Sequence, residues 1–357
     1  MKISDYEIRM RKPDDFHNHS RTGSLMHLVI PYTVPQFGRI LAMPNTLPNP
    51  IIIGPSAAEY KKDIEEFVRL SGVPGGEHFE VLPTIKLLES TTPEMILEAR
   101  KYGVIAGKAY PRGVTTNSDD GIADFKKLDA LFEAMQQTEM VLCLHGQLPD
   151  AFILQREREF LPILERICRD FPKLRIVFEH VSTSDAVSMV AMLPDTVAAT
   201  ITLHHMLLTL DDVIGGKLNP HNFCQPVVQS PEDRRAVLVA AFSGNPKFFF
   251  GSDSAPHLKS SKESGCCAAG VFSMVELVPS LVELFQSHGR LKALEPFSSE
   301  FGSDFYRLTR NEEAIHLISK ELAFGKRWAI PESIISEDGK LEVVPFRAGK
   351  EMQWTVV

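Results

Sequence analysis

The sequence has little of what marks a secreted, membrane-bound or nucleic-acid-binding protein. Cysteine is scarce, with 5 among 357 residues and no Cys-x-x-Cys spacing. An odd number of cysteines without this spacing argues against a disulfide framework or a zinc ribbon. It is typical of free thiols in a reducing compartment. Lys+Arg number 38 against 46 Asp+Glu, a net charge of −8, and no basic run occurs. We therefore expect no nucleic-acid partner and no basic membrane-binding patch.

Long apolar runs are also missing. The first residues, MKISDYEIRMRKPDD, are charged and lack the apolar segment of a signal peptide. The longest apolar runs are well short of a membrane span. The sequence therefore predicts a soluble, cytoplasmic protein with no membrane partner.

What recurs along the chain is a short apolar run followed by a helix-like stretch. Most of these runs are continuously apolar, as expected for parallel strands covered on both faces. They lie at 14–17, 39–45, 79–85, 103–110, 140–145, 174–180, 196–202 and 247–253. The helical patterns between them lie at 56–70, 92–102, 128–137, 155–170 and 231–243.

Eight strands alternating with helices over roughly 240 residues predict an α/β fold, a closed (β/α)8 or TIM barrel with a C-terminal extension. A doubly wound open sheet is the alternative, but no GxGxxG follows the first strand. No linker divides the chain, so we expect a single domain over 1–357. Its barrel core would span about 14–290, including a helix at 271–286. Closing helices and a C-terminal tail, mixed strand and coil at 340–357, would follow over about 291–357.

Chemically reactive side chains stand where the predicted strands end, and in a closed barrel these ends converge on the catalytic face. His17 and His19 are two residues apart, so on an extended strand both point the same way and can bind one metal. Each residue alone has an ordinary explanation, such as a helix N-cap for Asp253. Together, four histidines and an aspartate supply ligands for more than one cation. The other strand ends carry Asn45, Lys108, His145, Glu179, His180 and Asp253, with His257 just beyond.

Six other histidines are not expected to bind a metal, and two of them are expected to be structural. His204 and His205 follow the seventh strand but do not fit the same register. Four others fall in loops or helices and are expected at the surface: His27, His78, His288 and His316.

Lys108 is the unusual member of the set, because it ends an apolar strand and would point into a cluster of cations. A free ammonium there is repelled by the metals and costly to desolvate. One interpretation is a lysine that extends to the solvent at the rim. The other is that its amine has reacted with carbon dioxide to give N6-carboxylysine, an anionic ligand able to bridge two metals.

In these segments the chain resembles the amidohydrolase superfamily of metal-dependent hydrolases, and within it the short-chain, type II dihydroorotases. The resemblance covers about 14–346. His-x-His-x-Arg is shared by many amidohydrolases, whereas the segments at 108–117 and 251–257 are more specific. The segments that carry it are HNHSR (17–21), MPN (43–45), KAYP (108–111), TTN (115–117), LHG (144–146), EH (179–180) and GSDSAPH (251–257).

The resemblance implies two Zn²⁺ ions, one held by His17, His19 and Asp253 and the other by His145 and His180. Carboxylated Lys108 would bridge them. A hydroxide shared by the two ions would be the nucleophile, and Asp253 would act as general base and then general acid.

The resemblance also implies how a substrate is held. Arg21, Asn45 and His257 would bind its carboxylate, which the guanidinium fork suits, although a surface salt bridge is the plain alternative for Arg21. The implied reaction is the reversible interconversion of N-carbamoyl-L-aspartate and L-dihydroorotate in de novo pyrimidine biosynthesis, by a homodimer. Backbone groups would read the pyrimidine ring edge at Gln225 and Ala269, under a mobile loop that carries Thr115 and Thr116.

Three other functions stay open from the residues alone. The chain could process another cyclic amide, such as a hydantoin or allantoin. It could be a barrel that has lost activity and serves as a scaffold, although every expected ligand position is filled. It could also be a mononuclear nucleobase deaminase, which needs no bridge at Lys108.

Overall fold

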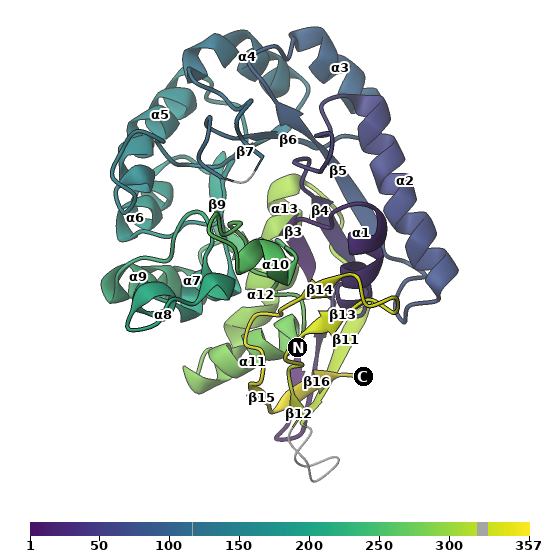
Figure 1. The fold of residues 1–357 in the computed structure, drawn as a ribbon. Coiled ribbons are helices and arrows are strands. Elements are labelled where there is room, and N and C mark those ends of the chain that lie inside the picture. The colour runs from purple at the N-terminus through teal and green to yellow at the C-terminus, as the bar shows by residue number, and fades with distance from the viewer. Residues whose placement is uncertain (116, 320–327) are drawn as a thin grey trace.

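Eight parallel strands form the wall of a barrel, hydrogen-bonded in chain order from the first to the last (Figure 1). The computed structural model describes residues 1–115, 117–319 and 328–357. The strands are β3 (Asp14–Asn18), β4 (Arg39–Ala42), β5 (Glu80–Leu87), β6 (Ala106–Ala109), β7 (Val141–Leu144), β8 (Ile176–Phe178), β9 (Val197–Ile201) and β10 (Phe248–Phe250).

The two ends of this sheet meet just beyond β3 and β10. The amide of Asp253 donates to the carbonyl of His17 at 2.9 Å, and Asn18 forms a parallel bridge with Ser254. The sheet is therefore nearly closed, and the predicted (β/α)8 barrel is confirmed.

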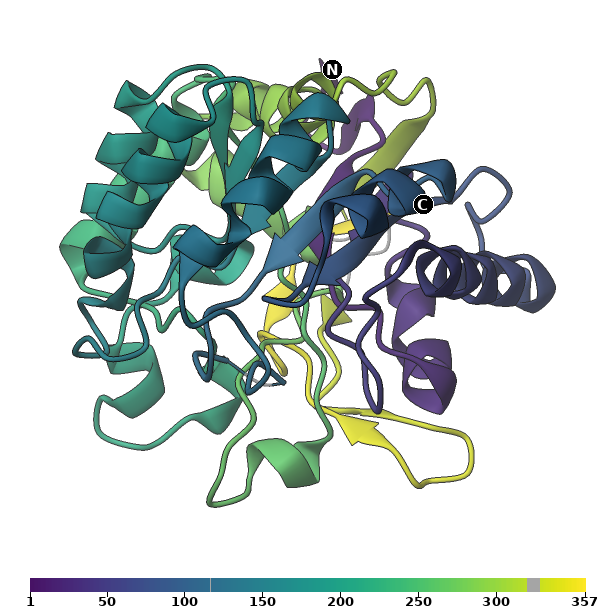
Figure 2. The ribbon, with the colours of Figure 1, turned by 90° about the horizontal axis from the view of Figure 1, so that it is seen from above.

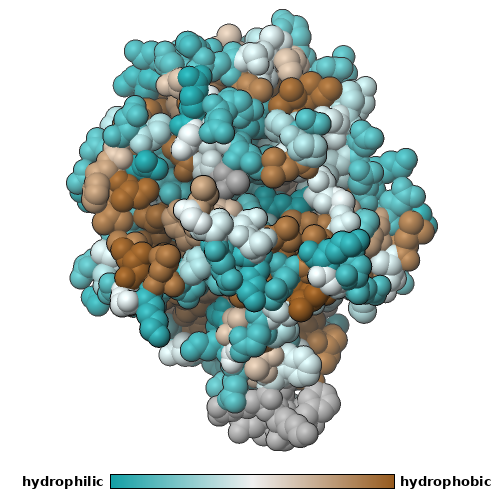
Figure 3. Space-filling model, viewed as in Figure 1, coloured by the Kyte–Doolittle hydropathy of each residue, from teal (hydrophilic) through white to brown (hydrophobic). Residues whose placement is uncertain are grey.

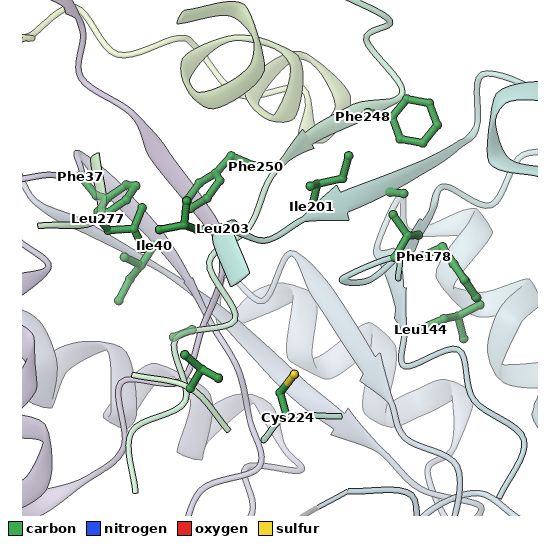
Figure 4. Close-up of a cluster of buried hydrophobic side chains, with 14 of the residues drawn as sticks. Phe37, Ile40, Leu144, Phe178, Ile201, Leu203, Cys224, Phe248, Phe250 and Leu277 are labelled. Carbon is green, nitrogen blue, oxygen red and sulfur yellow. The ribbon is translucent and has the colours of Figure 1, made fainter. Parts of the chain in front are cut away.

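Alternate residues of the strands face the inside and the outside of the barrel, as the two-residue period of a strand requires. Phe249 belongs to the small cluster inside the barrel, whereas Phe250 packs in the large cluster between strands and helices. Figure 4 shows Phe250 beside Phe37, whose ring centroid lies 5.9 Å away, and beside Leu277. Strands apolar on both sides are buried on both faces, which explains the continuous apolar runs.

Helices surround the barrel on its outer side (Figure 2). The five helices predicted between strands are present, and Thr92 and Ser230, each followed by proline, cap two of them. Among the described residues, none of the helices is long and apolar enough to span a bilayer. The α-helices are α1 (Gly23–Val29), α2 (Gly54–Ser71), α3 (Pro93–Lys101), α4 (Asp129–Gln137), α5 (Arg156–Asp170), α6 (Ser184–Met192), α7 (Leu203–Leu207), α8 (Asp211–Ile214), α9 (Pro231–Phe242), α10 (Lys259–Lys262), α11 (Leu277–Ser287), α12 (Leu294–Ser299) and α13 (Phe301–Tyr306). Short 3-10 segments lie at Ile30–Tyr32, Phe125–Leu128, Pro220–Asn222 and Leu291–Ala293.

The prediction of a helix over 271–286 was wrong about its first residue, because the helix begins at Leu277. Val271 forms a parallel bridge with Ser254, and its carbonyl accepts the amide of Ala255 at 2.8 Å. The chain is therefore held beside the mouth of the barrel before α11 begins. Glu276, with a φ of 53°, stands at the N-terminus of that helix.

The two ends of the chain share a second, four-stranded antiparallel sheet in the order β1-β2-β11-β16. Ile8 of β2 pairs with Leu317 of β11, and both are fully buried. Figure 1 shows both termini beside this sheet, and Figure 3 shows hydrophobic residues in separate patches on a largely hydrophilic face. Its strands are β1 (Lys2–Ile3), β2 (Glu7–Arg11), β11 (Ala314–Ser319) and β16 (Trp354–Val356), and two short pairs join β12 (Trp328–Ala329) to β15 (Glu351–Met352) and β13 (Ile334–Ile335) to β14 (Glu342–Val343).

Candidate active site

Four imidazoles and one carboxylate converge at the carboxyl end of the barrel. The ring centroid of His180 lies 5.1 Å from that of His17 and 4.7 Å from that of His145. The Oδ1 atom of Asp253 lies 3.4 Å from Nε2 of His17 and 3.1 Å from Nε2 of His19. The structure thus brings together residues more than two hundred positions apart in the chain, as the strand ends predict.

Two of these residues reach the site through a sharp turn after their strand. His180 and Asp253 have φ angles of 43° and 42°, a left-handed conformation that costs a non-glycine residue roughly 1–2 kcal/mol. The hydroxyl oxygen of Thr200 accepts the amide of His180 at 2.7 Å, and the carbonyl of His17 accepts the amide of Asp253. Neighbouring strands therefore stabilise both turns and fix the direction of both side chains.

A second carboxylate fixes the orientation of His17. Nδ1 of His17 donates to Oε2 of Glu179 at 2.7 Å, and the hydroxyl of Thr200 donates to the same oxygen at 2.6 Å. Although burial works to raise the pKa of Glu179, the charges of His17 and Lys108 hold it below its usual value. Because Nδ1 carries the proton, Nε2 of His17 is free to act as a ligand. The sequence placed Glu179 at a strand end without this role.

Lys108 lies inside the barrel wall. It stands two residues after Ala106 on β6, so its side chain points to the same inner side. It is fully buried, and its Nζ atom has no hydrogen-bond partner among the described residues. Burial lowers the pKa of Lys108, against the opposing effect of Glu179. A buried ammonium without a hydrogen-bond partner is costly, which shifts the equilibrium of this amine towards its neutral form.

The donor set fits metal binding. His17, His19 and Asp253 each offer a ligand atom, and these atoms lie within 4.8 Å of one another. Burial lowers the pKa of His19 to about 4 and that of His145 to about 3, so both rings are neutral, the form that binds a metal. Nδ1 of His180 and Nδ1 of His19 are buried without a hydrogen-bond partner among the described residues.

The residues predicted to contact a substrate border the same cavity. Thr116 lies outside the described residues, so its position is not compared. The lining includes the predicted Arg21, Asn45, Thr115, Gln225, His257 and Ala269 and also Tyr110, Ala255 and Gly270, which the sequence did not single out. Tyr110 belongs to the Lys-x-Tyr-Pro segment, which was the available signal for it.

Arg21 supplies the positive charge of this cavity. Its Nε donates to the carbonyl of Pro256 at 2.9 Å, and its Nη2 lies 3.1 Å from Nε2 of His257. Burial lowers the pKa of Arg21 to about 10, so it stays charged at neutral pH. Burial, and secondly Arg21, lower the pKa of His257 to about 2, so this imidazole is neutral. The same Nε2 lies 3.0 Å from the carbonyl oxygen of Ala269, and one nitrogen cannot accept from Arg21 and donate to Ala269 at once.

The histidines expected to be structural lie outside this cluster. His205 contacts the Thr202 hydroxyl at 2.8 Å and the Pro226 carbonyl at 3.1 Å, which satisfies both ring nitrogens. His204 is buried beside it, and these two residues and Cys224 hold ligand-type atoms within 4.8 Å of one another. Of the expected surface set, His316 is part-buried on β11 and the others are exposed: His27, His78 and His288.

Comparisons with known proteins find relatives over nearly the whole chain, although no family model matches it. A dihydroorotase of Microcystis aeruginosa is 42% identical over 355 residues, covering 97% of this chain and 98% of the relative. A Saccharomyces cerevisiae dihydroorotase crystallised with 5-fluoroorotic acid has a TM-score of 0.89 at 34% identity, covering 99% and 98% of the two chains. A dihydroorotase of Campylobacter jejuni has a TM-score of 0.85 at 34% identity, covering 98% and 97%.

The barrel and the residues at its strand ends define a hydrolase of the amidohydrolase superfamily. Within that superfamily, the chain belongs to the dihydroorotase family. The predicted class of enzyme, a hydrolase of a cyclic amide bond, is thereby confirmed.

Proposed function

We propose that the chain catalyses the reversible interconversion of N-carbamoyl-L-aspartate and L-dihydroorotate, in pyrimidine synthesis, with two zinc ions. The observation that carries the proposal is one cavity lined both by the histidine cluster with Asp253 and by Arg21, Asn45 and His257. Groups suited to bind cations thus share one cavity with groups suited to bind a carboxylate.

The donor set supports a pair of ions. His17, His19 and Asp253 would hold one ion and His145 and His180 the other, while a carbamate on Lys108 would serve both. The lowered pKa of Lys108 favours the neutral amine, which is the form that reacts with carbon dioxide. When bound, the ions would supply a hydroxide nucleophile at neutral pH and polarise the ring carbonyl.

Asp253 would move the proton. Burial works to raise the pKa of Asp253, yet the imidazoles of His17 and His19 hold it well below the usual value. Its carboxylate is therefore ionised at neutral pH and can accept the proton of the attacking water. It would return that proton to the departing ring nitrogen, and the same groups in reverse order would close the ring.

The cavity residues other than the metal-binding candidates would orient the substrate. The charged guanidinium of Arg21 and the amide of Asn45 can donate to a carboxylate from fixed directions. Main-chain groups of Gln225 and Ala269 border the cavity where the ring edge would lie. The substrate would therefore be held at both ends, with its scissile bond at the metal side.

The loop with Thr115 and Thr116 would cover the bound substrate. Its neighbouring part is anchored, because Nζ of Lys86 donates to the carbonyl of Asn117 at 2.9 Å and pairs with the carboxylate of Asp120. Thr115 borders the cavity, and its hydroxyl would contribute a hydrogen bond to the substrate.

The test is turnover of L-dihydroorotate, 5-substituted hydantoins and allantoin by the same preparation, with metal content measured per chain. The proposal predicts two zinc ions and turnover of dihydroorotate far above that of the other cyclic amides. One ion per chain would favour the deaminase-type site, and preference for a hydantoin would place the chain among other cyclic amidohydrolases.

The oligomeric state and the location of the chain are proposed as well. We expect a homodimer, which light scattering of the purified chain would measure. A cytoplasmic location is proposed as well, and the five free cysteines are typical of proteins in a reducing compartment.

A further inference from the structure

Lys262 is a buried lysine behind one wall of the cavity. It is the last residue of α10 and is 3% exposed. Its Nζ atom donates to three main-chain carbonyls: those of Phe223 at 2.8 Å, Ala268 at 2.8 Å and Gly270 at 2.7 Å. These bonds use all three protons of the ammonium. Among the described residues, Lys262 has no carboxylate partner, and its Nζ atom lies 5.8 Å from the ring centroid of Phe223.

The three carbonyls belong to the two segments that form this wall. Phe223 stands two residues before Gln225, and Ala268 and Gly270 flank Ala269. Gln225, Ala269 and Gly270 all border the cavity. The segments also contact each other directly, because the amide of Gly270 donates to the carbonyl of Phe223 at 3.0 Å. The ammonium therefore sits at the junction of the two segments.

This arrangement determines which side of the main chain faces the cavity. The carbonyls of Ala268 and Gly270 accept from Lys262, whereas the carbonyl oxygen of Ala269 between them lies 3.0 Å from Nε2 of His257. There is little room to shift, since a Cβ added to Gly270 would stand 2.6 Å from the carbonyl oxygen of Ala255.

We propose that Lys262 is a positioning residue for substrate recognition, which holds the segments at 223–225 and 268–270 so that the main chain of Gln225 and Ala269 faces the ring edge of the substrate. The proposal rests on the function proposed above. Lys262 touches neither the substrate nor the metal ligands, so its effect falls on binding of the ring and leaves the metal site intact.

The Lys262 amine also gives a pH signature. Burial lowers the pKa of Lys262 to about 8, while Cys267 and Cys224 act in the opposite direction. His204 and His257 are the other titratable groups that interact with it. The neutral amine has two protons for three carbonyls, so the wall loosens as the pH rises above about 8.

The test compares Lys262→Met with Lys259→Met, which removes the same charge from the exposed end of the same helix, where Lys259 pairs with Glu342. For dihydroorotate, Lys262→Met should raise KM by about 10- to 100-fold, the range expected for losing hydrogen bonds to a charged group. The kcat should change less than KM, and the zinc content should stay at two. Lys259→Met should leave all three unchanged.

A second variant separates positioning from stability. Lys262→Arg keeps the charge and several donors, so its KM should return most of the way to that of the unchanged chain. The KM of Lys262→Arg should stay flat from pH 7 to 9.5, while that of the unchanged chain rises. Faster hydrogen exchange over 266–272 in Lys262→Met would show the loosened wall even if that variant is unstable.

Four results would overturn the proposal. An unchanged KM in Lys262→Met, or equal exchange over 266–272, overturns the Lys262 inference alone. An equal rise of KM in Lys259→Met would show that the effect comes from the lost charge and not from the position of Lys262. Absence of dihydroorotate turnover by the unchanged chain would overturn the proposed function and this inference with it.

Discussion

Replacing Asp15 by alanine should open the seam where the barrel closes. Asp15 is fully buried on β3. Its carboxylate accepts the amides of His17 at 3.1 Å and Ser252 at 2.7 Å, the Ser252 hydroxyl at 2.6 Å and the Asn18 amide at 2.9 Å. These bonds join β3 to the segment after β10, where the metal-binding candidates His17 and Asp253 stand.

The size of the effect follows from the donors that lose their partner. The Ser252 hydroxyl can turn to the carbonyl of His17, 3.0 Å away, which leaves three buried donors unsatisfied. At about 1–3 kcal/mol for each, Asp15→Ala should lower the free energy of unfolding by roughly 3–6 kcal/mol, because some donors recover water. Asp15→Asn keeps one acceptor oxygen and should lose about half as much.

The assay is urea unfolding together with zinc content, and Asp233→Ala is the matched control. Asp233 also accepts several bonds, from the Ser184 amide and the hydroxyls of Ser184 and Ser230, but it joins α6 to α9 away from the site. Both variants should be less stable, and only Asp15→Ala should lose zinc. Full stability of Asp15→Ala, or equal zinc retention by both, would refute the reasoning.

The remaining predictions concern the site itself. Lys108→Ala should bind fewer than two metals and lose activity, with partial recovery by short carboxylic acids; two metals and full activity in this variant would exclude the bridge. Asp253→Asn should lower kcat by at least about 100-fold, and near-native turnover would remove its proton-transfer role. Changing Thr115 and Thr116 to alanine should reduce kcat/KM with zinc retained, and unchanged kinetics would remove the loop from catalysis. Burial lowers the pKa of the site imidazoles, to about 3 for His145. Below about pH 6.5 the unfolded chain therefore binds more protons than the folded chain. After chelation of the metal, the urea midpoint should therefore fall as the pH drops from 6.5 towards 4, whereas a flat midpoint would contradict this sign.

The barrel could be predicted because each strand carries its own signal. A run that is apolar on both faces, such as the one ending at Phe250, is read locally as a buried parallel strand. The same local pattern placed Lys108 and His145 at the carboxyl ends of their strands. The order of strands then brought these residues together, since parallel strand ends share one face of a barrel.

What the sequence did not reveal depends on contacts between distant segments. The pairing of Ile8 with Leu317 joins the first and last parts of the chain, and neither strand is distinctive alone. Asp15 contacts Ser252 after β10, and Glu179 contacts His17 on β3, so both act across strands distant in sequence. Lys262 binds carbonyl groups, which every residue carries. Such partners cannot be assigned from spacing.

One cavity at the strand ends is proposed to hold two metals around Lys108. X-ray diffraction of the zinc-loaded protein at energies on both sides of the zinc edge would locate both ions. We expect two anomalous peaks, one beside His17, His19 and Asp253 and one beside His145 and His180, with carbamate density on Lys108 between them. A single peak, or an unmodified Lys108 amine remote from both, would contradict this proposal.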